Sequence, residues 1–265
     1  MREISFEESK QILVKTLESI DKCCRANNLS YSLCWGTMIG AIRHKGFIPW
    51  DDDVDLMMPR KDYNRFLEVY KAPDYDIYAP KKNKNCIQLL IKVYNKHTKI
   101  FFGNHKKSLY GLWVSIFPYD NVPDENVRSW ERKRTFWMNI YHFKVVRFLT
   151  TDSLFTKCAK AILKIPVFPF SSFYLEKKAE KCLTAYNGKR TKQISLWDCG
   201  LGFTKFYYFP SDWFDEFIDV DFDGIKCRII KRYDEFLRLY YGDYMTPPPV
   251  DKQIPGHNYR AYYVD

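Results

Sequence analysis

The fold of this chain depends on the stretch Leu33–Pro59, which reads LCWGTMIGAIRHKGFIPWDDDVDLMMP. This stretch places a Gly-Thr pair ahead of four aspartates, and acidic and apolar residues alternate through Asp53–Met57. On an extended strand, Asp53 and Asp55 therefore point to one face, with their Cα atoms about 7 Å apart. Two carboxylates at this spacing can share a divalent cation.

The aspartates lie so close together in the sequence that their charges need compensation. Asp51 and Asp52 stand directly before Asp53, and acids at this spacing repel one another unless cations or basic groups offset the charge. An aspartate run is also typical of a solvated turn, but this run lies between two apolar segments, at 47–50 and 54–58. Part of the cluster is therefore expected on a buried strand, and the whole segment predicts a metal site.

A helix is expected to begin at Gly36-Thr37, after a short strand at Tyr31–Trp35. Backbone N–H groups at a helix N-terminus favour an anion, a glycine lets a phosphate approach closely, and Thr37 offers a hydroxyl. An ordinary strand-to-helix turn has the same pattern. The nearby acids favour a phosphate site over such a turn. A second phosphate can be held at the other end of the helix by Arg43, His44 and Lys45.

An acid-free stretch runs from Ile77 to Tyr119, so no carboxylate can come from it. Strands are expected at Cys86–Tyr94, Lys99–Phe102 and Leu112–Phe117, next to the strand of Asp53. A lysine-rich segment is most often a solvated face, but here some of the lysines can meet an anionic donor or acceptor. The lysines are Lys81, Lys82, Lys84, Lys92, Lys96, Lys99, Lys106 and Lys107.

The remaining patterns indicate a mixed α/β domain with flanking helices. Helices are predicted after the capping box at Ser5–Glu8, after Pro59 and over Lys231–Tyr241, and Asp223-Gly224 is typical of a hairpin turn. Residues 124–187 are expected to form a predominantly helical annex. The sequence contains no linker, repeat or low-complexity tract, which favours one domain over residues 1–265.

The segment WGTMIGAIRHKGFIPWDDDVDL, Trp35–Leu56, resembles the characteristic motif of the LicD family of phosphotransferases, relatives of fukutin-related protein in the nucleotidyltransferase superfamily. Two further blocks fit the same family, GLWVSIFPYD at Gly111–Asp120 and YGDYMTPPP at Tyr241–Pro249, with His257 shortly after. The blocks occur in family order, so the resemblance covers nearly the whole chain.

The resemblance implies a nucleotidyltransferase-like mixed sheet and a phosphotransferase reaction. Phosphocholine, or a similar group, would move from CDP-choline or another CDP-linked donor to a hydroxyl of a cell-surface glycan such as lipopolysaccharide or teichoic acid. By motif, Gly36 and Thr37 would hold the donor phosphates. Mg²⁺ or Mn²⁺ would be bound by Asp53 and Asp55, with Asp51 as an additional acid of the site.

One position departs from the family pattern. The family strand commonly supplies a third carboxylate where this chain has Ser115, and a hydroxyl cannot replace that charge. Either Asp51 or Asp120 completes the site, or a single ion suffices, or the activity is reduced. His257 can reach the site, although a lone histidine in a tail is more often structural or exposed.

Charge and cysteine content bear on the location of the protein. With 42 Lys+Arg against 32 Asp+Glu the net charge is +10, and the basic, aromatic helix expected after residue 124 can contact an anionic membrane where a lipid-linked glycan is assembled. An aromatic core face with a solvated basic face explains the same helix. The eight cysteines are scattered, and the N-terminus has no signal-peptide pattern, which predicts a cytoplasmic protein.

Two other classes of function stay open at this stage. A nucleotidyltransferase acting on RNA would also be basic and aromatic, but the positive charge forms no recognisable RNA-binding module, so no nucleic-acid partner is expected. A non-catalytic homologue that binds glycan or metal is the other alternative, because of Ser115.

Overall fold

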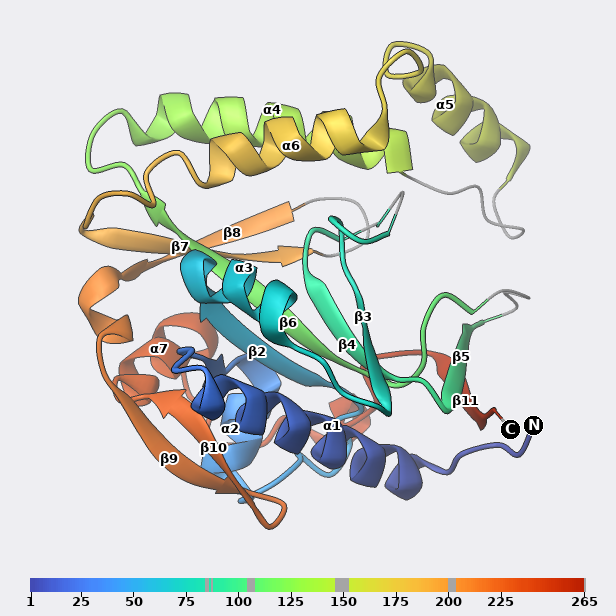
Figure 1. Cartoon of the computed structure of the whole chain (residues 1–265), viewed down its shortest axis with the longest axis vertical. Coiled ribbons are helices and arrows are strands. Elements are labelled where there is room, and N and C mark those ends of the chain that lie inside the picture. Colours follow the sequence, from blue (N-terminus) through green and yellow to red (C-terminus); the bar gives the residue numbers. More distant parts are fainter. Residues whose placement is uncertain (84–85, 87, 104–107, 146–152, 200–203, 265) are drawn as a thin grey trace. The chain divides into compact units, whose positions relative to one another are not determined.

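The computed structural model describes residues 1–83, 86, 88–103, 108–145, 153–199 and 204–264 (Figure 1). Helices and strands are mixed along the chain, which confirms the predicted α/β class. In chain order the elements are α1 (Phe6–Ala26), β1 (Ser32–Leu33), α2 (Trp35–Arg43), β2 (Val54–Pro59), α3 (Arg60–Val69), β3 (Tyr75–Tyr78), β4 (Ile91–Asn95), β5 (Thr98–Phe102), β6 (Trp113–Val122), α4 (Val127–Val145), α5 (Leu154–Lys164), α6 (Ser172–Leu183), β7 (Gln193–Cys199), β8 (Thr204–Pro210), β9 (Phe217–Phe222), β10 (Ile225–Ile230), α7 (Tyr233–Tyr241) and β11 (Tyr259–Tyr263), with short 3₁₀ turns at Ser211–Phe214 and Val250–Lys252.

The chain divides into two compact units. Unit 1 comprises Met1–Ile77, Ile91–Pro118 and Asp212–Asp265, and unit 2 comprises Tyr78–Leu90 and Tyr119–Ser211. Strand β6 contributes its first part to unit 1 and its last residues to unit 2. A single catalytic domain over residues 1–265 stays a prediction. Within the described residues, no helix is long and apolar enough to cross a membrane.

Strand β2 lies between β1 and β6 in a sheet of order β1-β2-β6-β4-β3. Val54, Leu56, Met57 and Met58 are fully buried, and α2 and α3 pack on the strand. A run of apolar residues this dense is typical of a strand covered on both faces. The acid-bearing strand is therefore held in the interior of the unit, as the sequence predicted.

The strands of the acid-free stretch differ from prediction at their ends. β4 begins at Ile91 and not at Cys86, because the residues just before Ile91 form a bend. β6 continues past the predicted end at Phe117 and includes Pro118. The proline lies between the residues that pair with β4 and those that pair with β7, so its missing N–H costs neither of these two ladders a hydrogen bond.

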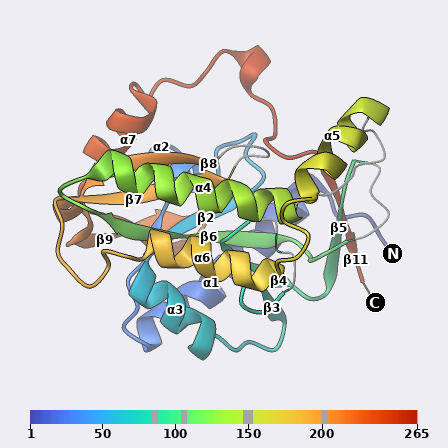
Figure 2. The same ribbon diagram turned by 90° about the horizontal axis from the view of Figure 1, so that it is seen from above.

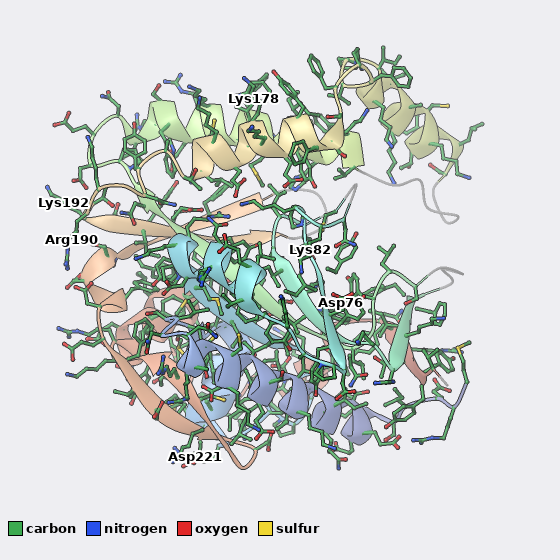
Figure 3. All side chains as sticks on the ribbon, in the orientation of Figure 1. Asp76, Lys82, Lys178, Arg190, Lys192 and Asp221 are labelled. Atoms are coloured by element: carbon green, nitrogen blue, oxygen red, sulfur yellow. The ribbon has the colours of Figure 1, made fainter. Side chains whose placement is uncertain are left out.

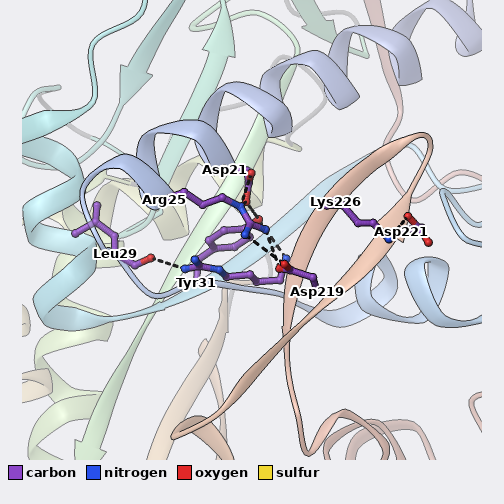
Figure 4. Close-up of polar contacts among 8 residues, drawn as sticks. Asp21, Arg25, Leu29, Tyr31, Asp219, Asp221 and Lys226 are labelled. Carbon is purple, nitrogen blue, oxygen red and sulfur yellow. Dashed lines mark hydrogen bonds and ion pairs between the residues drawn. The ribbon is translucent and has the colours of Figure 1, made fainter.

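Polar contacts join the end of α1 to the hairpin β9–β10 (Figure 4). Arg25 bonds to Asp21 within the helix and to Asp219 on β9, and the Tyr31 hydroxyl donates to Asp21. The hairpin turns at Asp223-Gly224, where both residues have positive φ, as the Asp-Gly pair predicted. The Ser5–Glu8 capping box at the start of α1 is also present.

In unit 2, α4 and α6 lie side by side (Figures 1 and 2), and the end of β6 pairs with β7, which pairs with β8. The predicted helical annex thus contains α4, α5 and α6. Trp130 and Tyr141 of α4 are buried, and the buried Arg134 lies over the Trp130 and Phe206 rings. Part of the aromatic face of α4 therefore belongs to the core, whereas Phe136 is exposed, and contact of this helix with a membrane stays a prediction.

Candidate metal and phosphate site

The four aspartates lie before and on β2. The neighbouring Val54 and Leu56 are fully buried, whereas Asp53 and Asp55 are partly exposed, so the alternation places both acids on one face as predicted. The backbone N–H and C=O of Asp55 both form hydrogen bonds. Its N–H donates to the Thr37 hydroxyl at 2.9 Å, and its C=O accepts from the Cys34 N–H at 2.9 Å.

The protein environment makes ionisation of these acids unfavourable. Burial raises the pKa of Asp51 to about 7, with further repulsion from Asp53 and Asp52. Burial also raises the pKa of Asp53, and burial together with the charge of Asp53 holds the pKa of Asp55 well above its usual range. Such a cluster is stable as carboxylates only with positive charge beside it.

The C-terminal tail brings His257 to the acids. Its Nδ1 lies 3.1 Å from Asp52 Oδ1 and 3.6 Å from Asp53 Oδ2, and its backbone N–H donates to Asp52 Oδ2 at 3.0 Å. The Tyr259 hydroxyl donates to the Asp52 carbonyl at 3.0 Å. Asp52, Asp53 and His257 each offer a ligand atom within 4.8 Å of the others, so this group can hold a metal ion.

Asp52 belongs to the site, although the sequence pattern assigned it no role there. Asp51, Asp53 and Asp55 share one parity along the chain, and Asp52 has the opposite one. The Asp52 residue is buried, at 7% exposure, and its carboxylate accepts a hydrogen bond from the C-terminal tail. The tail positions His257 because β11 pairs antiparallel with β5. This contact spans about two hundred residues, and no local pattern in the sequence indicates it.

The N-terminus of α2 lies against Asp51. The N-cap residue, Cys34, makes no side-chain cap hydrogen bond, and a Cβ placed on Gly36 would lie 2.9 Å from Asp51 Oδ2. Asp51 thus places its carboxylate near the positive end of the helix dipole, beside the position that the sequence assigned to a phosphate. The buried Thr37 connects α2 to β2 through Asp55. Phosphate binding by Gly36 and Thr37 stays a prediction.

The basic residues at the other end of α2 have protein partners. Arg43 donates to the His44 ring at 2.9 Å and to the Tyr244 carbonyl at 2.7 Å. The Lys45 carbonyl accepts from the Asp223 N–H at 2.8 Å. The α2 helix of 9 residues rises about 12 Å from end to end, so these side chains start well away from Gly36. Their role as a second phosphate site also stays a prediction.

Ser115 lies opposite Lys92 in the register of β6 and β4. Lys92 is buried, its Nζ lies 3.5 Å from Ser115 Oγ, and it stacks 4.4 Å from the centroid of the Trp113 ring. Ser115 Oγ also accepts from Trp113 Nε1 at 3.1 Å. The Ser115 hydroxyl lowers the pKa of Asp55, and the Lys92 charge lowers the pKa of both Asp53 and Asp55. Where the family pattern has a third carboxylate, this chain has a hydroxyl and a buried ammonium.

Among the lysines of the acid-free stretch that the structure describes, Lys92 faces the aspartates. The sequence could not single it out among eight, because its direction depends on the register with β6. Lys84, Lys106 and Lys107 lie outside the described residues.

Asp120 lies in the part of β6 that belongs to unit 2. Its side chain is buried, and Oδ1 accepts from Asn187 Nδ2 at 2.6 Å. Its participation in metal binding stays a prediction.

The chain is similar in sequence to known proteins. Residues 28–157 match the family described as LicD/FKTN/FKRP, nucleotidyltransferase domain. The chain is 30% identical, over 99% of its length and 99% of the relative's, to a protein of Haemophilus influenzae named lipopolysaccharide cholinephosphotransferase LicD. It is also 30% identical to an uncharacterized protein of Rickettsia prowazekii, over 44% of this chain and 52% of that one. The matched segment 28–157 contains the aspartates, α2, Lys92 and Ser115.

Proposed function

Because this chain belongs to the LicD family, we propose that it transfers phosphocholine, or a similar phospho-substituent, from a CDP-activated donor to a hydroxyl of a cell-surface glycan. The name of the Haemophilus relative, which aligns along nearly the whole chain, supports this reaction class over transfer to RNA. The observation that carries the proposal is the group of acids with raised pKa values at β2, formed by Asp51, Asp53 and Asp55.

These acids fit a divalent metal ion. Carboxylate oxygens are the ligands that Mg²⁺ and Mn²⁺ prefer, and burial and mutual repulsion raise the pKa of Asp51 and Asp55, so a cation beside them would favour their ionised form. We assign Asp51, Asp53 and Asp55 as the residues that hold the ion. We assign Asp52 and His257 as the pair that orients Asp53 from the side. When bound, the ion supplies positive charge beside the diphosphate oxygens of the donor.

Other residues of the chain bind and orient the reactants. We place the donor diphosphate at the first N–H groups of α2, beside Gly36, Thr37 and Asp51, where the helix dipole favours an anion. The acceptor hydroxyl loses its proton as its oxygen bonds to the transferred phosphorus and the bond between that phosphorus and the CMP oxygen breaks, so that CMP and a proton leave. In reactions of this type most of the catalysis comes from positioning and electrostatics.

Lys92 and Ser115 have a supporting role in this scheme. The ammonium keeps Asp53 and Asp55 closer to their ionised state, and the Ser115 hydroxyl has the same effect on Asp55. The pair supplies one fixed positive charge and no metal ligand, which favours a site with a single tightly held ion.

We further propose that the enzyme works in the cytoplasm, at the inner face of the membrane, on an acceptor that can be lipid-linked. The cysteines support a reducing compartment, since Cys24, Cys34 and Cys227 are buried as free thiols.

The test is a donor panel. Purified protein is incubated with CDP-choline, CDP-ribitol and CDP-glycerol and with lipopolysaccharide or teichoic acid, and CMP release is followed with Mg²⁺ and with EDTA. The proposal predicts Mg²⁺-dependent CMP release with one of the donors. A protein that binds glycan but releases no CMP from any donor is the non-catalytic homologue that Ser115 suggests.

A further inference from the structure

Helix α5 and the turn after it carry large apolar side chains that point into solvent. The exposed fraction is between 65% and 83% for the members of this set, which are Leu154, Phe155, Ile162, Ile165 and Phe168. In Figures 1 and 2, α5 lies at one end of the pair formed by α4 and α6, within the same unit. Leaving this much apolar surface in water is unfavourable and marks an interaction site.

The apolar residues of α5 share one face. At about 100° per residue, Leu154, Phe155, Ile162 and Ile165 fall within an arc of about 100° around the helix axis. Lysines occupy the opposite side, at positions 157, 160 and 164. A helix of a globular domain turns such an apolar face inward, as α4 does with Trp130 and Tyr141. In α5 the apolar face is turned outward.

The electrostatics of this surface favour an anionic partner. The segment 153–175 contains three lysines and no acid. Lys144 of α4 joins them, since its Nζ lies 3.1 Å from the Phe168 carbonyl oxygen and 3.4 Å from that of Val167. Burial, followed by the charges of Lys144 and Lys160, lowers the pKa of Lys164. A nearby anion would relieve this repulsion.

We propose that α5 and the turn to Phe170 dock on an anionic lipid surface, with the apolar side chains entering the headgroup region and the lysines contacting lipid phosphates. An outward apolar face with lysines on the polar side is the pattern of helices that lie in the plane of a membrane interface. A second copy of the chain fits less well. One short helix offers less than the about 800 Å² per partner that stable protein interfaces bury, and the lysines of two copies would repel each other.

This inference names a partner for the proposed function. It rests on that function, because docking on a membrane would bring the enzyme to a lipid-linked acceptor. Its test is flotation of the purified protein with vesicles of phosphatidylcholine alone and of phosphatidylcholine with phosphatidylglycerol, over a series of salt concentrations. Flotation needs no donor and no turnover, so failure here and failure of the proposed activity are separate results.

The wild-type protein is expected to float with the anionic vesicles and to be released as salt rises. The variant Phe155→Ser/Ile162→Ser is expected to lower the vesicle-bound to free ratio at least about tenfold, because two side chains no longer leave water. The matched control, Leu239→Ser/Ile254→Ser, removes two exposed apolar side chains from unit 1 and is expected to float like the wild type. All exchanged residues are exposed, and melting curves check that each variant folds.

Three results would overturn the inference. The wild type stays unbound with every vesicle, or it binds phosphatidylcholine alone equally well at all salt concentrations, or Phe155→Ser/Ile162→Ser floats like the wild type. Sedimentation velocity tests whether a second copy of the chain binds this face instead. A wild-type dimer that dissociates in the Phe155→Ser/Ile162→Ser variant would assign the face to that second copy.

Discussion

Replacement of Lys92 by methionine is expected to destabilise the metal-free protein in a way that depends on pH. The ammonium is buried, lies opposite Ser115 in the sheet, and lowers the pKa of Asp53 and Asp55. Methionine retains an unbranched apolar chain that can pack on the Trp113 ring in place of the lysine stem. The substitution therefore removes mainly the charge.

The magnitude follows from Coulomb's law. A charge shifts a carboxyl pKa from about 4–6 Å, and at about 5 Å with an effective dielectric constant of about 20 one pair contributes about 3 kcal/mol. Asp53 and Asp55 have raised pKa values in the folded protein, so they weaken the fold once they ionise as the pH rises. Below their folded pKa values they are neutral, and Lys92 has no partner charge to offset. We expect a loss of up to about 3 kcal/mol in unfolding free energy at about pH 8, where more of these carboxyl groups are ionised, and a smaller loss at about pH 5.

Urea unfolding in EDTA at both pH values measures this difference. Added Mg²⁺ is expected to stabilise Lys92→Met more than the wild type, because the ion enters a site with one positive charge fewer. The control is Lys226→Met, which breaks the exposed ion pair with Asp221 and is expected to change stability by less than about 1 kcal/mol. An equal loss at both pH values, with no larger effect of Mg²⁺, would show that Lys92 contributes packing and not charge.

Three further predictions address other parts of the structure. Burial, and then the charge of Glu180, raises the pKa of Glu176 to about 7, so ionisation of Glu176 weakens the fold as the pH rises above its pKa in the unfolded chain. Glu176→Gln should therefore raise the unfolding free energy, measured by urea titration, by about 3 kcal/mol at about pH 8 and leave it unchanged at about pH 4. A Cβ on Gly40 would lie 2.4 Å from the Gly46 carbonyl oxygen, so Gly40→Ala should cost about 2 kcal/mol in the same assay, and a neutral result would contradict the packing of α2 on this loop. Asp51→Asn should lower CMP release at least about tenfold, whereas Asp120→Asn should leave the Mg²⁺ concentration for half-maximal turnover within about twofold; the reverse result would move Asp120 into the metal site.

Much of the fold was predictable because its determinants are local. The alternation through Asp53–Met57 placed β2 and the direction of its acids, and Asp223-Gly224 placed a hairpin turn that needs positive φ. The capping box at Ser5–Glu8 placed the start of α1. In each case the residues that determine the structure lie within a few positions of one another, so a local pattern was sufficient.

The parts that the sequence did not predict depend on contacts between distant segments. Asp52 accepts a hydrogen bond from a tail that is held in place by the pairing of β11 with β5, and the sequence analysis predicted no strand in that tail. Lys92 faces the acids only because β4 pairs with β6 in a particular register. The outward face of α5 was hidden for another reason: its periodicity is that of any amphipathic helix, and the sequence does not say which way the apolar side points.

Turnover by aspartate variants tests the central claim most directly. CMP release from CDP-choline, or from whichever CDP-linked donor proves active, is measured with Mg²⁺ for the wild type, Asp53→Asn and Asp55→Asn. The matched control is Asp221→Asn at the tip of the hairpin β9–β10, far along the chain from the acids (Figure 3). The account predicts that each site variant loses at least about a hundredfold in rate with its circular dichroism unchanged, while the control retains wild-type turnover. Near-normal CMP release by Asp53→Asn or Asp55→Asn would contradict it.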